Sequence, residues 1–426
     1  MWSGVFGVAA AGVLLAACGG NNSSSDSASL RIANATINHK SLDLLVNSAV
    51  SVSGTASDTV SVYVSPSSGA NTLQLNDAGG STALATLAPT LTGGYHYTLL
   101  AYESGGNVKA VVLPEDVAAP AAGVTLRIYD TAVDAGKLDV YVTANDCTNL
   151  TNVSVTTSFA AITSPAVASV NQGAGTWNVC VTGGGTKTDL RMSMPITITN
   201  QTVATVALTP ASGGILIDGS LITQQGAYAG TRNPNVRVRM AAAVSGAANV
   251  TATATTAAGS VSIDPSGLSP AFGFYTLIPA TSTINVGIPS GSVASPTGLV
   301  AGSDMTLLVY GSPSSATAKL LLDDNRPPTD STTVKMRLIN GVTGTSGALT
   351  FTVNSALVAT GVAPDTASAY TAVAGSSTTA LNLNFTSSLS SGNYYSTSTS
   401  LNLNSVYSVM LVGGGGDGVA QQVLIR

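Results

Sequence analysis

Few side chains in this sequence could do chemistry. His39 and His96 are the two histidines of the 426 residues, and Glu103 and Glu115 are the two glutamates. His39 falls in a predicted turn beside Lys40. No G-x-S-x-G motif supports a Ser-His-Asp triad, and serines are so common here that one near a histidine means little. Both glutamates fall in predicted turns or linkers, which disfavours the paired carboxylates of a glycosidase. We therefore expect no enzyme activity and no cofactor.

Cys147 and Cys180 are the cysteines that follow Cys18. An oxidising compartment favours a disulfide between them. The closed loop of about 33 residues would add roughly 3–4 kcal/mol of stability. Two free buried thiols are the alternative, whereas a metal site lacks a neighbouring His or further Cys. Trp177, three residues before Cys180, is expected to pack on the disulfide.

Three aspartates at a proline-rich joint, Asp323, Asp324 and Asp330, could supply oxygen ligands for Ca²⁺. No EF-hand or repeat-in-toxin spacing accompanies them, and solvated turn carboxylates explain the pattern. We therefore expect no metal, and these three aspartates are the alternative calcium ligands.

Aromatic residues suggest one candidate binding surface. Tyr95 and Tyr97 have the alternating spacing of one strand face, and Tyr102 is nearby. Together they could present a platform for a glycan or another extracellular polymer. The same spacing is also typical of a sandwich core, so both interpretations stay open.

The start of the sequence predicts the cellular location of the protein. Residues 2–17 are almost wholly apolar and end in Leu15-Ala16-Ala17 before Cys18 and Gly19. This pattern resembles a bacterial lipobox, in which the cysteine is lipidated and becomes the mature N-terminus. The resemblance implies a signal peptide at 1–17, a lipidated Cys18, and a flexible tether over 18–28. Gly19 in place of Asp implies an outer-membrane lipoprotein of a Gram-negative bacterium.

Composition limits the fold and the partners. Only 8% of the residues are charged and 44% are hydrophobic, with a net charge of −5 and no basic cluster. Nucleic acid is therefore excluded as a partner. The hydrophobic content and the repeated alternating segments argue against disorder. Abundant Thr and Val favour strands, and helical periodicity is nearly absent.

A strand with a central arginine recurs about every 100 residues, at Arg31, Arg127, Arg237 and Arg337. A second predicted strand follows it, with Asp43, Asp139, Asn249 and Leu349 each 12 positions after the arginine. Each repeat then ends in two strands joined by a Gly- or Ser-rich turn, which predicts a closing hairpin. We interpret the first two strands as an opening hairpin. Leu126 and Ile128 face one way, so Arg127 is expected to point outward and to protect an edge strand from pairing.

The stretch from Arg127 to Val142, with Asp130, Asp134 and Asp139-Val140-Tyr141, resembles the bacterial family known as domain of unknown function 4397. The first repeat shares Arg31, Asn34 and Asp43 with this pattern. The resemblance extends at lower specificity over residues 29–426. It implies a β fold and carries no activity.

Strands of this length with frequent turns predict an all-β fold, a tandem array of four Ig-like β-sandwich domains. The predicted domains cover residues 29–119, 120–232, 233–329 and 330–426. Prolines at the joints favour a semi-rigid rod. We expect a non-enzymatic envelope lipoprotein with a structural, adhesion or assembly role, held to the membrane by its lipid anchor. Its protein or polysaccharide partner is unknown, and the alternative is a glycan- or polymer-binding protein.

Overall fold

The computed structural model describes residues 27–160, 164–246, 248–289, 291–344, 347–388, 393–414 and 421–426. The predicted signal peptide, Cys18 and most of the predicted tether lie outside the described residues. Within those ranges the chain is all-β apart from one 3₁₀ turn, η1 (Val133–Ala135). The predicted fold class, a tandem array of β-sandwich domains, is confirmed.

Each domain consists of an inner sheet, which we define as the sheet that holds the first strand of the repeat, and an outer sheet. The strands of domain 1 are β1 (Ser29–Asn34), β4 (Thr59–Val60), β9 (His96–Ser104) and β10 (Asn107–Pro114) in the inner sheet, β2 (Ser41–Val46), β3 (Ala49–Ala56), β6 (Leu73–Asp77) and β7 (Ala83–Leu87) in the outer sheet, and a small ribbon of β5 (Gly69–Ala70) and β8 (Thr90–Leu91). The strands of domain 2 are β11 (Val124–Asp130), β14 (Ala166–Gln172), β17 (Thr202–Pro210), β18 (Ile217–Thr223) and β19 (Tyr228–Thr231) in the inner sheet, and β12 (Leu138–Thr143), β13 (Thr157–Phe159), β15 (Gly175–Gly183) and β16 (Leu190–Ile198) in the outer sheet.

Domains 3 and 4 repeat this plan. The strands of domain 3 are β20 (Asn235–Val244), β24 (Ala271–Phe272), β25 (Thr276–Pro279), β28 (Asp304–Gly311) and β29 (Thr317–Asp323) in the inner sheet, and β21 (Asn249–Thr256), β22 (Gly259–Ser262), β23 (Gly267–Leu268), β26 (Thr283–Ile288) and β27 (Gly291–Ser292) in the outer sheet. The strands of domain 4 are β30 (Thr333–Thr343), β33 (Thr366–Ala367), β34 (Thr371–Ala374), β37 (Val406–Gly414) and β38 (Gln421–Ile425) in the inner sheet, and β31 (Leu349–Val353), β32 (Ala356–Val362), β35 (Leu381–Ser387) and β36 (Asn393–Thr399) in the outer sheet.

The strand pairing confirms one predicted hairpin and corrects the other. The closing strands form antiparallel pairs in every repeat, β9 with β10, β17 with β18, β28 with β29 and β37 with β38. The predicted opening hairpin is wrong, because β1 and β2, like β11 and β12, belong to opposite sheets of one sandwich. The first strand instead runs parallel to the first strand of the closing hairpin, as β1 does with β9. The segment between the first two strands crosses from one sheet to the other. The short spacing of these strands along the chain was therefore not sufficient evidence for a hairpin.

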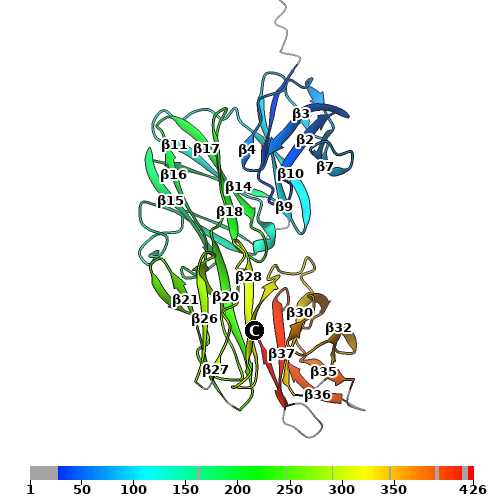
Figure 1. Ribbon diagram of the computed structural model, residues 1–426. Coiled ribbons are helices and arrows are strands. Elements are labelled where there is room, and N and C mark those ends of the chain that lie inside the picture. The colour runs from blue at the N-terminus through cyan, green and yellow to red at the C-terminus, as the bar shows by residue number, and fades with distance from the viewer. Residues whose placement is uncertain are drawn as a thin grey trace, which may run out of the picture.

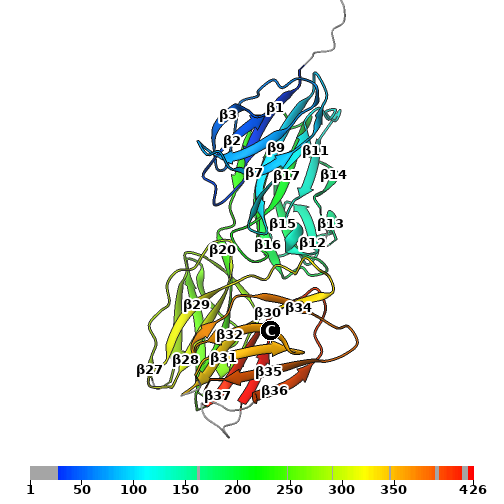
Figure 2. The same cartoon turned by 90° about the vertical axis from the view of Figure 1, so that its right-hand side faces the viewer.

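The four domains are arranged as two side-by-side pairs, which corrects the predicted rod (Figures 1 and 2). Domain 1 lies beside domain 2, and domain 3 lies beside domain 4. In each pair the two inner sheets pack face to face through an apolar cluster, with Leu100 and Ala207 in the first pair and Leu308 and Met410 in the second. Each inner sheet is therefore buried on both faces, by its own sandwich core and by the neighbouring domain. Proline joints restrict the backbone, but this apolar surface decides how the domains sit.

Asn233 joins the two pairs. Its side-chain Nδ2 donates to the carbonyls of Arg191 at 2.7 Å and Ile217 at 3.1 Å in domain 2, and its backbone amide donates to Asp218. Asn235, which begins domain 3, donates its amide to the Asn233 side chain at 3.1 Å. The joint is thus held by a buried amide that bonds on both sides, and it does not behave as a free linker.

The predicted disulfide is present between Cys147 and Cys180, with their Cα atoms 5.5 Å apart. It packs with Tyr141 and Leu150 in a small cluster on the outer face of β15. Trp177 does not pack on it but lies against the sandwich core. Residues 177 and 180 are an odd number of positions apart on one strand, so their side chains point to opposite faces.

We expect the double substitution Cys147→Ala and Cys180→Ala to lower the stability of domain 2 by about 3 kcal/mol, because the closed loop restricts the unfolded chain. Trp177 reports this domain, since the other tryptophan, Trp2, lies in the predicted signal peptide. Urea unfolding followed by Trp177 fluorescence, with and without a reductant, measures the effect. An unchanged midpoint in the oxidised wild type and the double variant would contradict the stabilising role.

Candidate functional site

The arginines of the first strands are buried at the seams between paired domains. Arg31, Arg127, Arg239 and Arg337 have only 3%, 9%, 4% and 2% of their surface exposed. Their strands are interior strands of their sheets, so the predicted role in protecting a free edge is wrong. The alternation that turns each arginine away from its own core is present as predicted. The direction it points, however, is covered by the next domain.

The third repeat requires a second correction. The prediction chose Arg237, but Arg239 occupies the equivalent register. Arg31 lies opposite Thr98 on the parallel strand, Arg337 lies opposite Ser408, and Arg239 lies opposite Thr306. Arg237 lies opposite Asp304 and contacts that carboxylate at 3.5 Å. The first strand of domain 3 carries two arginines on one face. The prediction assumed a constant spacing to the second strand and therefore selected the wrong arginine.

The seam between domains 3 and 4 holds a reciprocal network. Arg239 Nε donates to Thr306 in its own domain at 3.1 Å, and its Nη2 donates across the seam to Ser408 at 2.8 Å. Arg337 Nε donates to Ser408 in its own domain at 2.9 Å, and its Nη2 donates across the seam to Thr306 at 3.1 Å. Each guanidinium thus spans both inner sheets and satisfies a hydroxyl acceptor on each.

One carboxylate serves both arginines of this seam. Asp323 forms an ion pair with Arg337, lies 3.5 Å from Arg239 and accepts a hydrogen bond from Thr306 at 2.6 Å. Burial disfavours the charge of Arg337, but Asp323 together with the nearby tyrosines outweighs it and raises the pKa of the guanidinium. A charged arginine at this depth is stable only because it is paired and hydrogen-bonded.

Aromatic rings cover the guanidinium faces of the same network. The Cζ of Arg239 lies 4.6 Å from the ring centre of Phe272 and 4.5 Å from that of Tyr275, and the Cζ of Arg337 lies 4.8 Å from that of Tyr370. A ring face attracts a cation electrostatically. These contacts offset part of the excess positive charge left by two arginines and one aspartate.

The seam between domains 1 and 2 has the same plan with different partners. Arg31 Nε donates to Thr98 at 2.8 Å, and its Nη2 pairs with Glu115 at 2.5 Å. Across the seam Arg31 donates to the carbonyls of Gly226 and Thr223 in domain 2. Glu115 and Asp323 are equivalent, since each is two residues beyond the leucine paired with Thr98 or Thr306. At this register each seam therefore has one carboxylate beside two arginines, Glu115 in the first pair and Asp323 in the second.

Arg127 differs from its counterpart Arg337 in one respect. Both donate from Nη1 to the carbonyl just before the shared carboxylate, that of Pro114 at 2.8 Å or Leu322 at 2.9 Å. Arg337 pairs directly with the carboxylate, whereas no ion pair of Arg127 appears among the described residues. Burial accordingly lowers the pKa of Arg127.

The aspartates of the second strands organise turns. Asp43 accepts the backbone amides of Gly54 at 2.7 Å and Gly79 at 2.9 Å, and these bonds, the Gly79 bond foremost, hold its pKa below the usual value. Asp139 accepts the amide of Gly185 at 2.8 Å and the hydroxyl of Ser158 at 2.6 Å. The aspartate in this motif thus fastens neighbouring turns to the outer sheet.

The residues considered for catalysis lie apart in domain 1. His39 Nδ1 contacts Asp77 at 2.7 Å and His96 Nδ1 contacts Asp116 at 3.2 Å, all four with partly exposed side chains. Glu103 accepts the backbone amides of the loop before His39, and Glu115 pairs with buried Arg31. The two glutamates are therefore bound to structural partners.

The alternative calcium ligands point to different partners. Asp323 belongs to the buried arginine network, Asp324 lies between Arg326 at 2.7 Å and Lys335 at 2.9 Å, and Asp330 accepts from the amide and hydroxyl of Thr332. Across the described ranges, no group of three or more His, Cys, Asp or Glu residues could hold a metal ion.

The predicted tyrosine platform does not form. Tyr95 is half exposed in the turn before β9, Tyr97 packs against the core of domain 1, and Tyr102 is buried in the seam with domain 2. Residues 97 and 102 point to opposite faces because an odd number of positions separates them. The correction applies above all to Tyr102, which is only 3% exposed.

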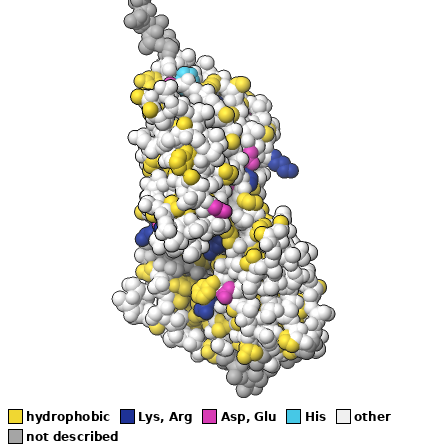
Figure 3. Space-filling view, turned by 90° about the vertical axis from the view of Figure 1, so that its left-hand side faces the viewer, with side chains coloured by type: hydrophobic (Ala, Val, Ile, Leu, Met, Phe, Trp, Pro, Cys, Tyr) yellow, Lys and Arg dark blue, Asp and Glu magenta, His cyan; other side chains and the backbone are white. Residues whose placement is uncertain are grey.

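One face of the molecule carries little charge (Figure 3). In Figure 3 one face shows only scattered acidic and basic side chains among uncharged polar and apolar ones. No helix in the described part of the chain is long and apolar enough to cross a membrane.

Comparison with known proteins agrees with the strand pattern. Residues 28–141 match the family model described as "Domain of unknown function (DUF4397)". This match confirms the predicted DUF4397 resemblance. It covers domain 1, β11 and the first part of β12, and so includes Arg31, Asp43, Arg127 and Asp139. No curated protein matches the chain.

Among solved structures, the Bacillus anthracis TIE protein matches 87% of this chain with 9% identity and a TM-score of 0.14. The match covers 65% of that protein, so this chain spans less than two thirds of its length.

We expect Arg337→Ala to destabilise the second pair by about 3–5 kcal/mol, because it leaves Asp323 buried with a weaker partner. Arg127→Ala serves as the matched substitution in the first pair. It should cost only about 1–2 kcal/mol, since a single carbonyl hydrogen bond is lost. Calorimetric unfolding of both variants measures the difference. Equal losses would show that the ion pair with Asp323 is not what distinguishes the seams.

Asp130 provides a prediction on pH. It is fully buried, its Oδ2 has no hydrogen-bond partner, and burial raises its pKa to about 6. The equivalent Asn34 and Asn340 use their Nδ2 to bond carbonyls at 3.0 Å. Because the folded pKa lies above that of an unfolded Asp, folding takes up a proton as the pH falls through about 6. Domain 2 should therefore gain stability between pH 7 and pH 4.

Asp130→Asn should raise the stability of domain 2 at pH 7.5 by about 2 kcal/mol and remove this gain on acidification. The urea midpoint from Trp177 fluorescence, measured at pH 7.5 and pH 5, is the readout. Asp146→Asn, in an exposed turn, is the control and should change neither value. If Asp130→Asn behaves like this control, the buried carboxylate does not lower the stability of domain 2.

Proposed function

We propose that this protein is a non-enzymatic lipoprotein of the Gram-negative outer membrane with a structural, adhesion or assembly role. The observation that carries the proposal is the use made of its charged groups. The seam arginines are buried and bond groups of the neighbouring domain, and the carboxylates Glu115 and Asp323 are buried with them, so these side chains hold domains together. Residues committed in this way are unavailable to bind and release a substrate.

The stiffness of the body supports the same proposal. Arg232 adds a third link between domains 1 and 2, because it bonds Asp58 and the carbonyls of Ala35 and Thr36 in domain 1 as well as Asp218 in domain 2. Gln224 bonds both the amide and the carbonyl of Val117 at the domain joint. A protein whose domains are fixed by many buried contacts suits a role in which shape is presented or a distance is kept. The predicted lipid on Cys18 would attach this body to the membrane.

The anchor is tested by Cys18→Ser in the full-length chain, expressed in a Gram-negative host. Wild type should incorporate an alkyne-tagged fatty acid and sediment with outer membranes, and Cys18→Ser should lose the label, because lipidation needs this thiol. Cys147→Ser with Cys180→Ser is the matched control and should keep it. An unlabelled wild type would refute the lipoprotein assignment.

The proposed role is tested by complementing cells that lack the protein. The wild-type protein should restore adhesion and the normal permeability of the envelope. Arg337→Ala, which weakens the seam between domains 3 and 4, should restore them less well. Protease treatment of intact cells then shows which face of the membrane carries the protein. A purified wild-type chain with turnover in a broad hydrolase screen, abolished by His39→Ala or His96→Ala, would overturn the non-enzymatic proposal.

A further inference from the structure

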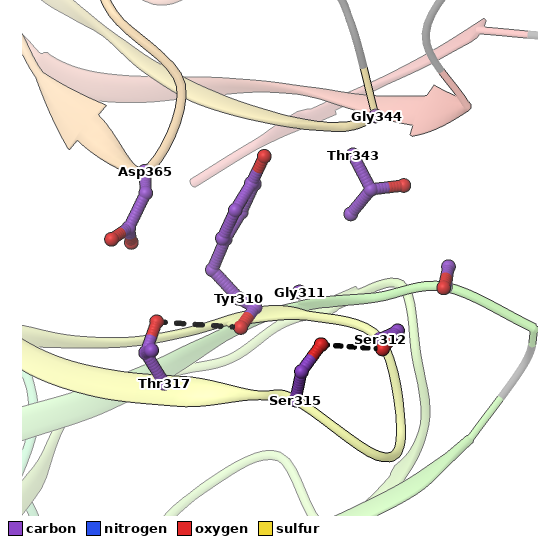
Figure 4. A pocket seen from close by; sticks show the side chains of 9 residues that line it. Tyr310, Gly311, Ser312, Ser315, Thr317, Thr343, Gly344 and Asp365 are labelled. Atoms are coloured by element: carbon purple, nitrogen blue, oxygen red, sulfur yellow. Dashed lines mark hydrogen bonds between the residues drawn. The ribbon is translucent and has the colours of Figure 1, made fainter.

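A cleft of about 600 Å³, lined mostly by hydroxyl-bearing residues, opens at the rim of the seam between domains 3 and 4 (Figure 4). One wall is the closing hairpin of domain 3, with Tyr310, Ser312, Ser315 and Thr317. The other wall is formed by domain 4, where Thr343 ends β30 and Asp365 precedes β33. Volumes between about 300 and 1,000 Å³ are typical of small-molecule sites in proteins.

The corresponding place in the first pair is closed. There Asp134 of domain 2 accepts hydrogen bonds from the hydroxyl of Ser104 at 3.2 Å and the amide of Gly105 at 3.3 Å, so the rim of the seam is sealed against the hairpin of domain 1. Asp130 and Asn340 are equivalent, since each accepts the amide two residues further on. Four residues beyond them stand Asp134 and Gly344. In the second pair Gly344 lines the open cleft and carries no side chain that could bond the hairpin.

The hairpin tyrosines show the same difference. Tyr102 and Tyr310 are equivalent, because each lies four residues after the seam threonine, Thr98 or Thr306. Tyr102 is buried in the seam, whereas Tyr310 is only partly buried and its ring stands inside the cleft between Asp365 and Thr343. The Tyr310 hydroxyl donates to the carbonyl of Val342 at 2.9 Å, and this bond fixes the orientation of the ring in the cleft.

The cleft walls are hydrogen-bonding but carry no net charge. Hydroxyls of Ser312, Ser315, Thr317 and Thr343 line it. Ser312 and Ser315 bond each other at 2.7 Å, and Thr317 and Thr343 donate to backbone carbonyls. Their oxygens keep lone pairs that can accept from a ligand hydroxyl. The carboxylate of Asp365 is matched by Lys319 at 3.0 Å. An anion would meet these acceptor oxygens and a lysine that is already paired, whereas an apolar ligand would make no use of them. A neutral ligand with many hydroxyls and one C–H face for the tyrosine ring fits these walls.

We propose that this cleft binds a neutral saccharide, with the Tyr310 ring against one sugar face and the hairpin hydroxyls bonded to sugar hydroxyls. The proposal does not depend on lipidation or on an envelope role. It differs from a tyrosine platform in domain 1, because the site lies between two domains and exists only when domains 3 and 4 are paired.

The test uses the complete folded chain and a panel of neutral tetrasaccharides, maltotetraose, cellotetraose and chitotetraose, with an oligogalacturonate as the anionic probe. Saturation-transfer NMR detects binding and titration gives Kd. Ser315→Trp places an indole in the cleft from an exposed turn and should weaken binding of the neutral probe by about tenfold or more. Asn107→Trp, at the equivalent exposed position of the closed first pair, is the matched control and should leave Kd unchanged.

Ser312→Ala with Ser315→Ala is a second variant that keeps the fold and removes two hydroxyls, and it should weaken binding several-fold. Binding of the soluble sugar is compared with binding of the same sugar as an insoluble polymer. This comparison distinguishes a site for free saccharide from a site for the end of a polymer chain. The proposal is overturned by three outcomes: no neutral probe bound at about 10 mM, binding of the anionic probe alone, or equal effects of Ser315→Trp and Asn107→Trp.

Discussion

A guanidinium buried between two sheets must find acceptors for its donors and an anion for its charge, because leaving either unmet costs several kcal/mol. Three of the four seam arginines have both acceptors and a carboxylate, whereas Arg127 donates to a carbonyl and shows no ion pair among the described residues. A threonine or serine stands opposite most of the seam arginines on the parallel strand, as Thr98 does for Arg31 and Ser408 for Arg337. A carboxylate stands at the end of the closing strand of each odd-numbered domain, with Glu115 just after β10 and Asp323 as the last residue of β29. The closing hairpin therefore provides one inner-sheet edge and also the anion for the seam.

The apolar part of the seams provides the attraction, and the polar part defines the register. Burial of Leu100, Ala207, Leu308 and Met410 favours association but is tolerant of sliding. The reciprocal bonds of Arg239 and Arg337 can all form in one alignment of the two sheets only. This division of labour explains how a chain with 8% charged residues keeps a defined four-domain arrangement.

The sandwiches, the closing hairpins and the disulfide could be predicted from the sequence, because each depends on local alternation, turn residues or cysteine chemistry. The pairing of domains could not, although a signal was present. Closing strands such as Thr98-Leu99-Leu100-Ala101-Tyr102 are apolar at both odd and even positions, which is typical of a strand buried on both faces. Alternation alone placed the arginines on the face away from their own core, and only that second apolar face indicates that another sheet covers them. The choice between Arg237 and Arg239 depended on strand register, which spacing along one chain does not define.

The seams of the two pairs have the same plan, but the rims of the seams differ. This difference follows from how many bonds hold a seam residue and how few hold a rim residue. A seam residue such as Thr306 has bonds to two arginines and a carboxylate, so exchanging it disturbs several partners at once. A rim residue such as Asp134 bonds the turn it faces and otherwise has one long ion pair, with Arg326 at 4.0 Å. Gly344 lines the cleft of the second pair and takes no part in the arginine network, so the rim can be open while the seam stays bonded. At Gly344, with φ near +86°, a side chain would also be strained, so the backbone itself keeps this space open. A rigid, closed pair and a rigid, open pair can thus be built from one plan, with the stability of each seam independent of what its rim binds.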